Sequence, residues 1–217
     1  VATLSQGRLD DALQGFGDIS RIQGDYEDIN VVRDLASMNQ GRILLENGQL
    51  AEAKDAYQNV SRSSPHFEDA LYEVTWAYVQ AADRAETISQ RDGEYQKALN
   101  ALEILLLGDA QSQIAPEAQL LTGNIMVRLG RYEEAMVVFD KVVAGYGPIR
   151  DEVATLISQM GKPSVFFQEF MQRRSQGQSI LPQLAVSLAE GEARLHKAMS
   201  VVDQLETAER WVSDSDE

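Results

Sequence analysis

The chain has 217 residues, and its 44% hydrophobic and 24% charged residues are typical of an ordinary folded protein. None of its apolar runs approaches the ~18 residues that a membrane-spanning helix needs. Its 34 acidic residues outnumber 19 lysines and arginines, and the net charge of −15 disfavours nucleic acid and anionic lipid as partners while it suits basic or neutral protein surfaces. There is no cysteine, which excludes disulfides and thiolate metal sites.

The N-terminal part predicts one partial and one complete helical hairpin. Residues 8–21 have the pattern of a second hairpin helix whose partner is missing. We therefore expect the chain, which begins at Val1 and has no signal-peptide pattern, to be a fragment cut inside or just before a repeat. A polar bridge over 23–28 precedes two helices predicted over 30–46 and 49–62, where apolar residues recur at steps of three and four.

The middle of the chain predicts two more hairpins. Helices over 67–82 and 94–107 flank the polar segment 83–93, which either extends a helix or forms a projecting loop. Insertions in repeat proteins often serve binding, although a solvated variable loop is the simpler interpretation. The last hairpin runs over 116–143, with Pro116 at its start as expected near a helix N-terminus.

One pattern of residues recurs in all four hairpins. A Gly is followed by an aromatic residue or Leu two positions later, by Ala five positions later and by a bulky apolar residue nine positions later. The four sets are Gly7-Leu9-Ala12-Phe16, Gly48-Leu50-Ala53-Tyr57, Gly93-Tyr95-Ala98-Leu102 and Gly130-Tyr132-Ala135-Phe139. We expect each of these glycines at the bend between two helices, and small residues such as Gly123 and Ala135 where the helices pack closely. Spacings of this size predict stacked helical hairpins, an all-α solenoid.

These segments resemble tetratricopeptide repeats, whose unit of about 34 residues has a small residue in the first helix, Gly at the turn, then an aromatic residue, Ala, a bulky residue and Pro. Residues 34–67 fit without a gap, and 116–149 fit with Pro148 one place late. Residues 68–112 depart, because they carry eleven extra residues and have Thr75 where the small Gly would be. The resemblance implies an α-solenoid with a protein-binding role.

The C-terminal part has a different character. Residues 144–148 predict a break, and a helix over 149–160 and a short apolar helix containing Phe166 and Phe170 would then cover the end of the solenoid. A heptad rhythm over 181–212 predicts a long helix, either in a coiled coil or folded back along the solenoid. The predicted organisation is a solenoid over 1–149, a helical cap over 150–174 and a long helix with an acidic tail over 175–217.

No set of residues supplies a recognisable chemistry. His66 and His196 have no second ligand at metal spacing. Gly161-Lys162-Pro163-Ser164 lacks the upstream Gly of a phosphate loop, and Pro163 removes a backbone donor. Since no nucleophile is accompanied by a base and an orienting group, we predict a protein that is not an enzyme, with no catalytic residue, cofactor or metal.

The resemblance also implies a concave groove lined by the first helix of each hairpin. The groove positions fall on Leu35, Met38, Arg42 and Leu45, on Asp69, Tyr72, Trp76 and Val79, and on Glu117, Leu120, Asn124 and Val127. Tyr72 and Trp76 are residue types that dominate binding energy when a pocket desolvates them, although Trp76 would equally well pack under the insertion. Some relatives hold a terminal carboxylate with Lys, Arg and Asn, but Leu120 and Met38 stand where Lys is wanted. An extended or helical peptide with apolar anchors and some basic residues fits better.

The leading hypothesis is a non-catalytic scaffold that binds a protein partner in this groove. The chain is similar in general character to bacterial cell-envelope repeat proteins, which favours a periplasmic or envelope-associated assembly or motility complex. One alternative is a structural module that self-associates through 181–212. Another is an accessory module of a larger enzyme.

Overall fold

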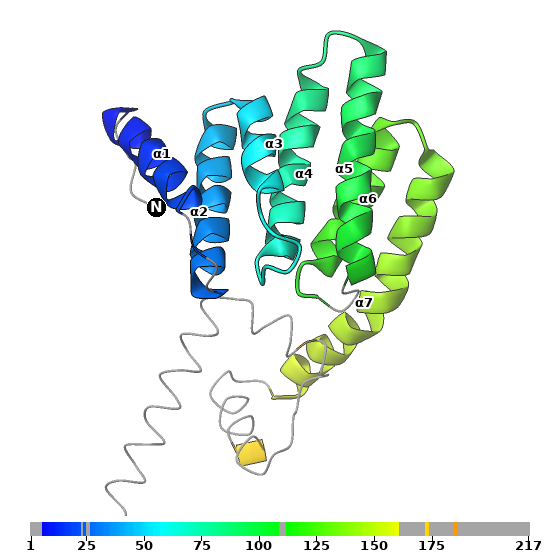
Figure 1. Ribbon diagram of the computed structural model, residues 1–217. Helices are drawn as coiled ribbons and strands as arrows, with labels where there is room; N and C mark the ends of the chain where they lie inside the picture. Colours follow the sequence, from blue (N-terminus) through cyan, green and yellow to red (C-terminus); the bar gives the residue numbers. More distant parts are fainter. Residues whose placement is uncertain are drawn as a thin grey trace, which may run out of the picture. The chain divides into compact units, whose positions relative to one another are not determined.

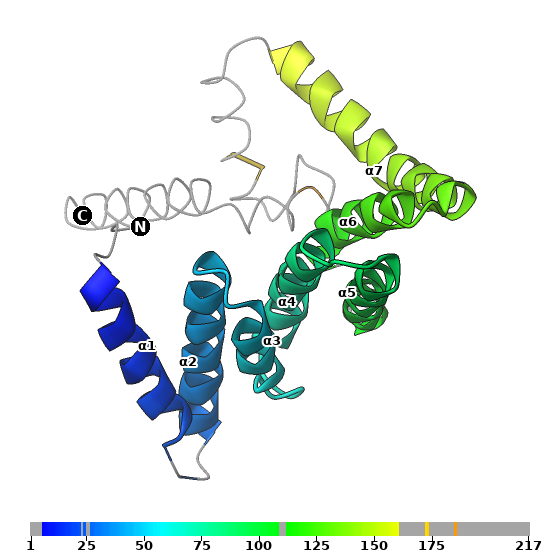
Figure 2. The same cartoon turned by 90° about the horizontal axis from the view of Figure 1, so that it is seen from above.

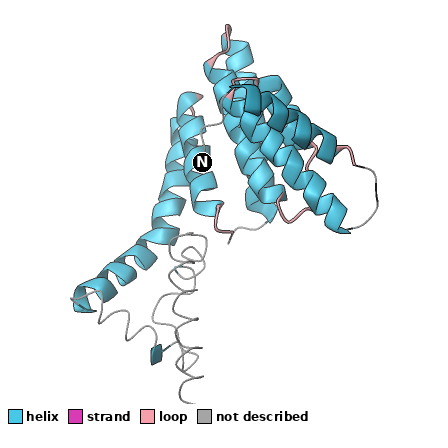
Figure 3. Cartoon of the chain, turned by 90° about the vertical axis from the view of Figure 1, so that its left-hand side faces the viewer, coloured by secondary structure: helices cyan, strands magenta, loops and turns pink. Residues whose placement is uncertain are grey.

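The computed structural model describes residues 6–22, 24, 27–108, 112–160, 172, 173 and 185. Within these residues the chain forms helices and connecting loops without a strand (Figure 3). The helices are α1 (Gln6–Ser20), α2 (Glu27–Glu46), α3 (Leu50–Gln58), α4 (Phe67–Asp83), α5 (Ile88–Gly108), α6 (Ala115–Arg128) and α7 (Tyr132–Met160). The chain divides into two units, Val1–Asp140 and Lys141–Glu217.

In the first unit, each helix from α1 to α6 packs against the next one along the chain (Figures 1 and 2). Helix α2 also contacts α4, so the first helices of two successive hairpins lie side by side. This combination of neighbour and next-but-one contacts is the arrangement of an α-solenoid, which confirms the predicted fold class.

Small residues set the spacing of the helices. Ala53, Ala98 and Ala135 of the repeated pattern are 0%, 0% and 1% exposed, as expected at points of close approach. A Cβ atom added at Gly41 would come within 2.8 Å of the Tyr57 ring, so α3 lies directly on the backbone of α2 there. Gly123 has the same relation to the ring of Phe139. The aromatic residue of the second helix therefore fills the space that a side chain on the first helix would take.

The buried side chains form two neighbouring clusters. One contains Met38, Leu44, Tyr57 and Val74, and it lies between α2, α3 and α4. The other is formed by α4, α5 and α6 and contains Val79, Tyr95, Leu99, Leu102, Leu105, Leu121 and Ile125. Helix α4 contributes to both clusters, so a continuous core connects the hairpins rather than closing within each one.

The bends are as predicted at two of the glycines and not at a third. Gly48 and Gly130 have φ of 74°, which a residue with a side chain rarely adopts. The prediction that Gly93 lies at a bend is wrong, because α5 begins at Ile88 and Gly93 lies within it. The side chain of Thr87 accepts the N–H of Gln90 at 3.2 Å and the Gln90 side chain accepts the N–H of Thr87 at 3.2 Å. This reciprocal cap starts the helix early, so part of the insertion lengthens α5.

Gly7 likewise lies inside a helix, as the second residue of α1. The predicted helix boundaries elsewhere agree within a few residues, except that α3 ends at Gln58 and not at Arg62.

The predicted break at 144–148 is also wrong. Helix α7 continues to Met160 with Pro148 inside it. Proline removes one helical hydrogen bond and crowds the preceding turn, at about 3 kcal/mol. The helix-forming stretches on both sides outweigh that penalty. The apolar helix proposed to complete the cap and the heptad helix over 181–212 lie outside the described residues, apart from 172, 173 and 185.

Candidate partner-binding face

The predicted groove residues come from three helices, α2, α4 and α6. The structure leaves four large apolar members exposed, namely Leu35, Trp76, Leu120 and Val127. Arg42, Glu117 and Asn124 are also exposed, while Leu45, Asp69 and Tyr72 are partly buried. We call these ten residues the α2–α4–α6 face.

Two of the predicted groove residues belong to the core. Met38 is 1% exposed and Val79 is 5% exposed, so neither presents a side chain to a partner. Both lie on the side of their helix that turns toward the second helix of the hairpin, where Met38 joins the cluster around Tyr57 and Val79 joins the cluster around Leu102. A site on this surface therefore excludes them.

Two aromatic residues mark the middle of the face. The rings of Tyr72 and Trp76 meet edge to face, with centroids 6.5 Å apart. Burial, with a smaller contribution from the neighbouring Glu117 carboxylate, raises the pKa of the Tyr72 hydroxyl. Tyr72 also packs against the core cluster to which α4 and α6 both contribute, so the two helices approach each other there.

A cavity of about 340 Å³ opens between α2 and α4. We call it the α2–α4 cavity, and it is lined by Arg42, Leu45, Glu46, Tyr57, Glu73, Trp76 and Gln80. Trp76 is 41% exposed, so its indole forms an accessible wall beside α2 rather than a buried contact. The cavity is at the small end of the roughly 300–1,000 Å³ range of ligand pockets, which suits one side chain of a partner.

An ion pair spans the α2–α4 cavity. Arg42 donates from Nε to one Glu73 oxygen at 2.8 Å and from Nη2 to the other at 2.5 Å. A third guanidinium N–H donates to Asn39 at 3.1 Å. This two-pronged bond, followed in importance by the charge of Glu73, raises the pKa of Arg42. It fixes α2 against α4 and gives the cavity a rigid polar wall.

Tyr57 also lines the α2–α4 cavity, and its hydroxyl is buried. The residue is 3% exposed, and the hydroxyl lies near the Glu73 carboxylate but makes no hydrogen bond of acceptable geometry within the described residues. Burial is the main cause that raises the pKa of this hydroxyl, and the Glu73 carboxylate adds to it, so the group stays protonated. The sequence analysis assigned Tyr57 only to packing and did not identify Glu46, Glu73 and Gln80 as cavity residues. The packing of α2 against α4 brings these three side chains together, and no local sequence pattern indicates it.

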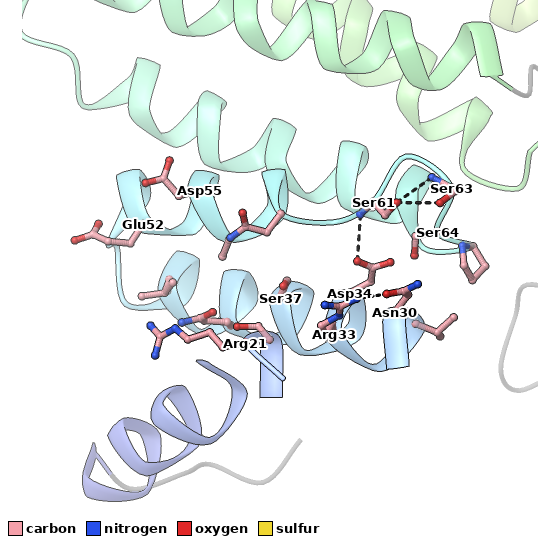
Figure 4. A pocket seen from close by; sticks show the side chains of 17 residues that line it. Arg21, Asn30, Arg33, Asp34, Ser37, Glu52, Asp55, Ser61, Ser63 and Ser64 are labelled. Carbon is pink, nitrogen blue, oxygen red and sulfur yellow. Dashed lines mark hydrogen bonds between the residues drawn. The ribbon is translucent and has the colours of Figure 1, made fainter. Parts of the chain in front are cut away.

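A second, larger cavity lies between α1, α2 and α3 and measures about 950 Å³ (Figure 4). Its deepest charged group is Asp34, which is 6% exposed and accepts the Ser61 N–H at 3.1 Å. Arg33 donates to the carbonyl oxygens of Ile22 and Gly24, both at 3.3 Å, and to the side chain of Asn30. These groups hold the connections that precede α2 and follow α3. The cavity contains none of the predicted groove residues, and we assign these hydrogen bonds to folding.

The part of the chain that the structure describes contains neither a candidate metal site nor a candidate membrane-spanning helix. It contains no group of three or more His, Asp or Glu side chains arranged to hold a metal ion. None of its helices has the length and apolar character to cross a bilayer.

Stacked antiparallel helical hairpins with glycine bends and alanine contacts define the class of helical repeat proteins. Two family models of the tetratricopeptide repeat match the chain, one over residues 35–66 and the other over residues 90–148. These two segments of the chain are therefore tetratricopeptide repeats. No match to the chain was found among curated proteins or among solved structures. Repeats of this family are scaffolds for protein–protein interaction.

Proposed function

We propose that the α2–α4–α6 face binds an extended or helical segment of a protein partner that carries apolar anchors and basic residues. The observation that carries the proposal is the exposure of Leu35, Trp76, Leu120 and Val127 on the first helices of the hairpins. Exposed large apolar side chains on one surface are typical of a protein interface. The edge-to-face pair of Tyr72 and Trp76 supplies a rigid aromatic anchor at its centre.

The charge of the molecule supports the basic character of the partner. The net charge is −15, and Glu46, Asp69, Glu73 and Glu117 lie on or beside the α2–α4–α6 face. Complementary charge on the partner would speed association and disfavour acidic competitors. In line with the resemblance to bacterial cell-envelope repeat proteins, we place this binding in an envelope-associated assembly, which fractionation of the source cells would check.

The test is a binding measurement with matched variants. A partner captured by the intact chain and identified by mass spectrometry is titrated against the wild type, the double variant Trp76→Ala/Leu120→Ala, and Ile104→Ala. Ile104 is 50% exposed on α5, away from the proposed site, and serves as the apolar control. Loss of an anchor residue typically weakens an interface by about 2 kcal/mol or more, roughly thirtyfold in Kd.

We expect the double variant to lose binding and the Ile104→Ala variant to retain it, with unchanged helical circular dichroism in both. Binding that survives the double variant would show that the partner uses another surface.

A further inference from the structure

The larger cavity, between α1, α2 and α3, contains a buried hydroxyl that the fold does not use. We call it the α1–α2–α3 cavity, and Asp34, Ser37, Gln40 and Asn59 are among the residues that line it (Figure 4). Ser37 is 3% exposed and lies in the middle of α2. Hydroxyls inside helices commonly donate to the carbonyl oxygen four residues earlier, as Thr75 does at 2.8 Å. Within the described residues the Ser37 hydroxyl has no such bond, and it remains available to the cavity.

The same cavity contains a buried carboxylate without a counter-ion. Asp34 is 6% exposed, and one of its oxygens accepts the Ser61 N–H at 3.1 Å. The other oxygen has no hydrogen bond within the described residues, and no described cation forms an ion pair with this carboxylate. Among the described side chains, only Tyr57 has a polar atom that is both enclosed and unpaired, so the free atoms of Asp34 and Ser37 are open to the cavity.

These two groups lie together and attract a cation. Asp34 and Ser37 are three residues apart on α2 and so belong to one face of the helix, and Figure 4 shows both side chains on the side of α2 that faces α3. A buried charge is costly unless it is paired. The missing partner of the Asp34 carboxylate is therefore a positively charged group that also donates to the Ser37 hydroxyl oxygen.

The geometry selects among cations. The described residues contain no group of three or more metal-ligating side chains, which disfavours a metal ion. A guanidinium binds best to both oxygens of one carboxylate, but one oxygen of Asp34 is already occupied by the Ser61 N–H. A primary ammonium is a compact charge with three donors. It fits one carboxylate oxygen, one hydroxyl and a third acceptor, which the side-chain amide of Gln40 or Asn59 can supply.

The remaining charges of the cavity also favour a positive ligand. Glu52 and Asp55 add two exposed carboxylates to its lining, against the guanidinium groups of Arg21 and Arg33. Arg33 already donates to two backbone carbonyl oxygens, both at 3.3 Å, and Arg21 is exposed. Three carboxylates against two guanidinium groups leave the lining negative, in a protein of net charge −15. An anionic ligand would meet Asp34 at the buried end.

We propose that the α1–α2–α3 cavity binds a primary alkylammonium group, with the free oxygen of Asp34 and the hydroxyl oxygen of Ser37 as hydrogen-bond acceptors. A free aliphatic diamine and the lysine side chain of a protein both carry this group. The volume of about 950 Å³ is that of a small-molecule site, and Glu52 and Asp55 offer carboxylates for a second ammonium, so a diamine uses the cavity more fully.

The probe is putrescine, a diamine with four methylene groups, titrated into the intact chain by isothermal titration calorimetry. We expect saturable binding at one site. The neutral diol and the dicarboxylate adipate have the same four methylene groups, and we expect neither to bind. Because the Ser61 N–H donates to Asp34, its backbone amide signal in the NMR spectrum should shift with putrescine and report the place of binding.

N-acetyl-lysine amide distinguishes the two sources of the ammonium, since it has the same four methylene groups and only one charge. Weaker binding than that of putrescine would assign the cavity to a diamine. Equal binding would assign it to a lysine side chain of a protein. Both outcomes support the ammonium site, whereas a lack of saturable binding by either amine would overturn it.

Three variants connect the binding to the proposed contacts. Asp34→Asn keeps an acceptor for the Ser61 N–H and removes the charge, and it should weaken putrescine binding roughly tenfold or more. Ser37→Ala preserves the helix and should weaken binding about fivefold, the typical effect of one hydrogen bond. Glu103→Gln, an exposed carboxylate on α5, removes the same charge elsewhere and should leave the affinity unchanged. Circular dichroism checks the fold of each variant.

The inference would be overturned by wild-type affinity in Ser37→Ala together with a folded Asp34→Asn variant that binds normally. It would equally be overturned by a diol or adipate that binds as well as putrescine. The site shares no residue with the α2–α4–α6 face. Partner binding by Trp76→Ala/Leu120→Ala therefore tests the proposed function alone, and putrescine binding tests the α1–α2–α3 cavity alone.

Discussion

Two buried tyrosines show how the surroundings of a hydroxyl determine whether it stabilises or destabilises the fold. Tyr57 and Tyr95 are both 3% exposed. The Tyr95 hydroxyl donates to Asp83 at 2.6 Å and accepts from Arg128 at 3.0 Å. The Tyr57 hydroxyl lies near Glu73 but makes no hydrogen bond of acceptable geometry with any described residue. A buried hydroxyl with partners stabilises the fold, and one without partners carries an uncompensated desolvation penalty of about 1–3 kcal/mol.

The two phenylalanine substitutions should therefore have opposite effects. We expect Tyr57→Phe to raise the free energy of unfolding by about 1 kcal/mol and Tyr95→Phe to lower it by about 1–2 kcal/mol. Urea unfolding followed by circular dichroism measures both, and each variant is the control for the other. A loss of stability in Tyr57→Phe would mean that its hydroxyl has a partner in the free protein.

At the scale of helices, a cluster of polar side chains connects both helices of the α4–α5 hairpin with the following helix, α6. Asp83 ends α4, Tyr95 lies on α5 and Arg128 ends α6. Arg128 pairs with Asp83 at 2.6 Å, and its guanidinium carbon lies 6.0 Å from the centre of the Tyr95 ring. The hydrogen bond from Tyr95 is the largest cause that lowers the pKa of Asp83, and the hydrogen bond from Arg128 lowers it further.

This lowered pKa predicts a dependence of stability on pH. The contribution of ionised Asp83 is fully present above the ordinary pKa of about 3.8 and is lost as the pH falls below that value through the folded one. The Asp83 side chain is 46% exposed, so solvent screens its ion pair with Arg128. We therefore expect the pair to contribute about 0.5 kcal/mol to the free energy of unfolding. The double-mutant cycle of Asp83→Asn and Arg128→Met, measured by urea unfolding, isolates this coupling from other carboxylates.

We expect the coupling energy to be constant between pH 7 and about pH 5 and to decrease progressively as the pH is lowered below 3.8. A coupling that persists at low pH would assign the contact to packing on the Tyr95 ring instead of charge.

At the scale of the whole molecule, the dominant property is the net charge of −15. Most charged side chains with a described partner form local pairs on the surface, such as Arg131 with Glu134 and Arg150 with Asp151, which contribute little to stability. The excess negative charge is thus available to act on other molecules at a distance. Its range is about 10 Å at 0.1 M salt and falls to about 3 Å at 1 M.

Association with a basic partner should accordingly depend on salt. Between 0.05 M and 0.5 M NaCl we expect the association rate constant to fall at least tenfold and the dissociation rate constant to change much less. Surface plasmon resonance with the captured partner measures both. An association rate that does not change with salt would show that the partner is not basic and that apolar contacts alone bring the two together.

The sequence determined the features that depend on local spacing. The glycines at Gly48 and Gly130 and the alanines at Ala53, Ala98 and Ala135 follow from the sterics of bends and close helix contacts, and those are encoded within a few residues. The same local rules contained a signal that sequence analysis overlooked, the reciprocal Thr87 and Gln90 cap that starts α5 ahead of Gly93. The break predicted at Pro148 does not occur, because the continuity of a helix depends on the stretches on both sides of the proline together.

The tertiary structure alone decided which groove positions face outward and what lies between the helices. Met38 and Val79 share the periodicity of the exposed residues, and only the packing of each hairpin places them in the core. The α2–α4 cavity joins Glu46, Tyr57 and Glu73, which come from three helices and have no common motif. Periodicity specifies the direction of a side chain around its own helix, whereas a site between helices depends on how closely neighbouring helices approach, and that distance is set by contacts far apart in the chain.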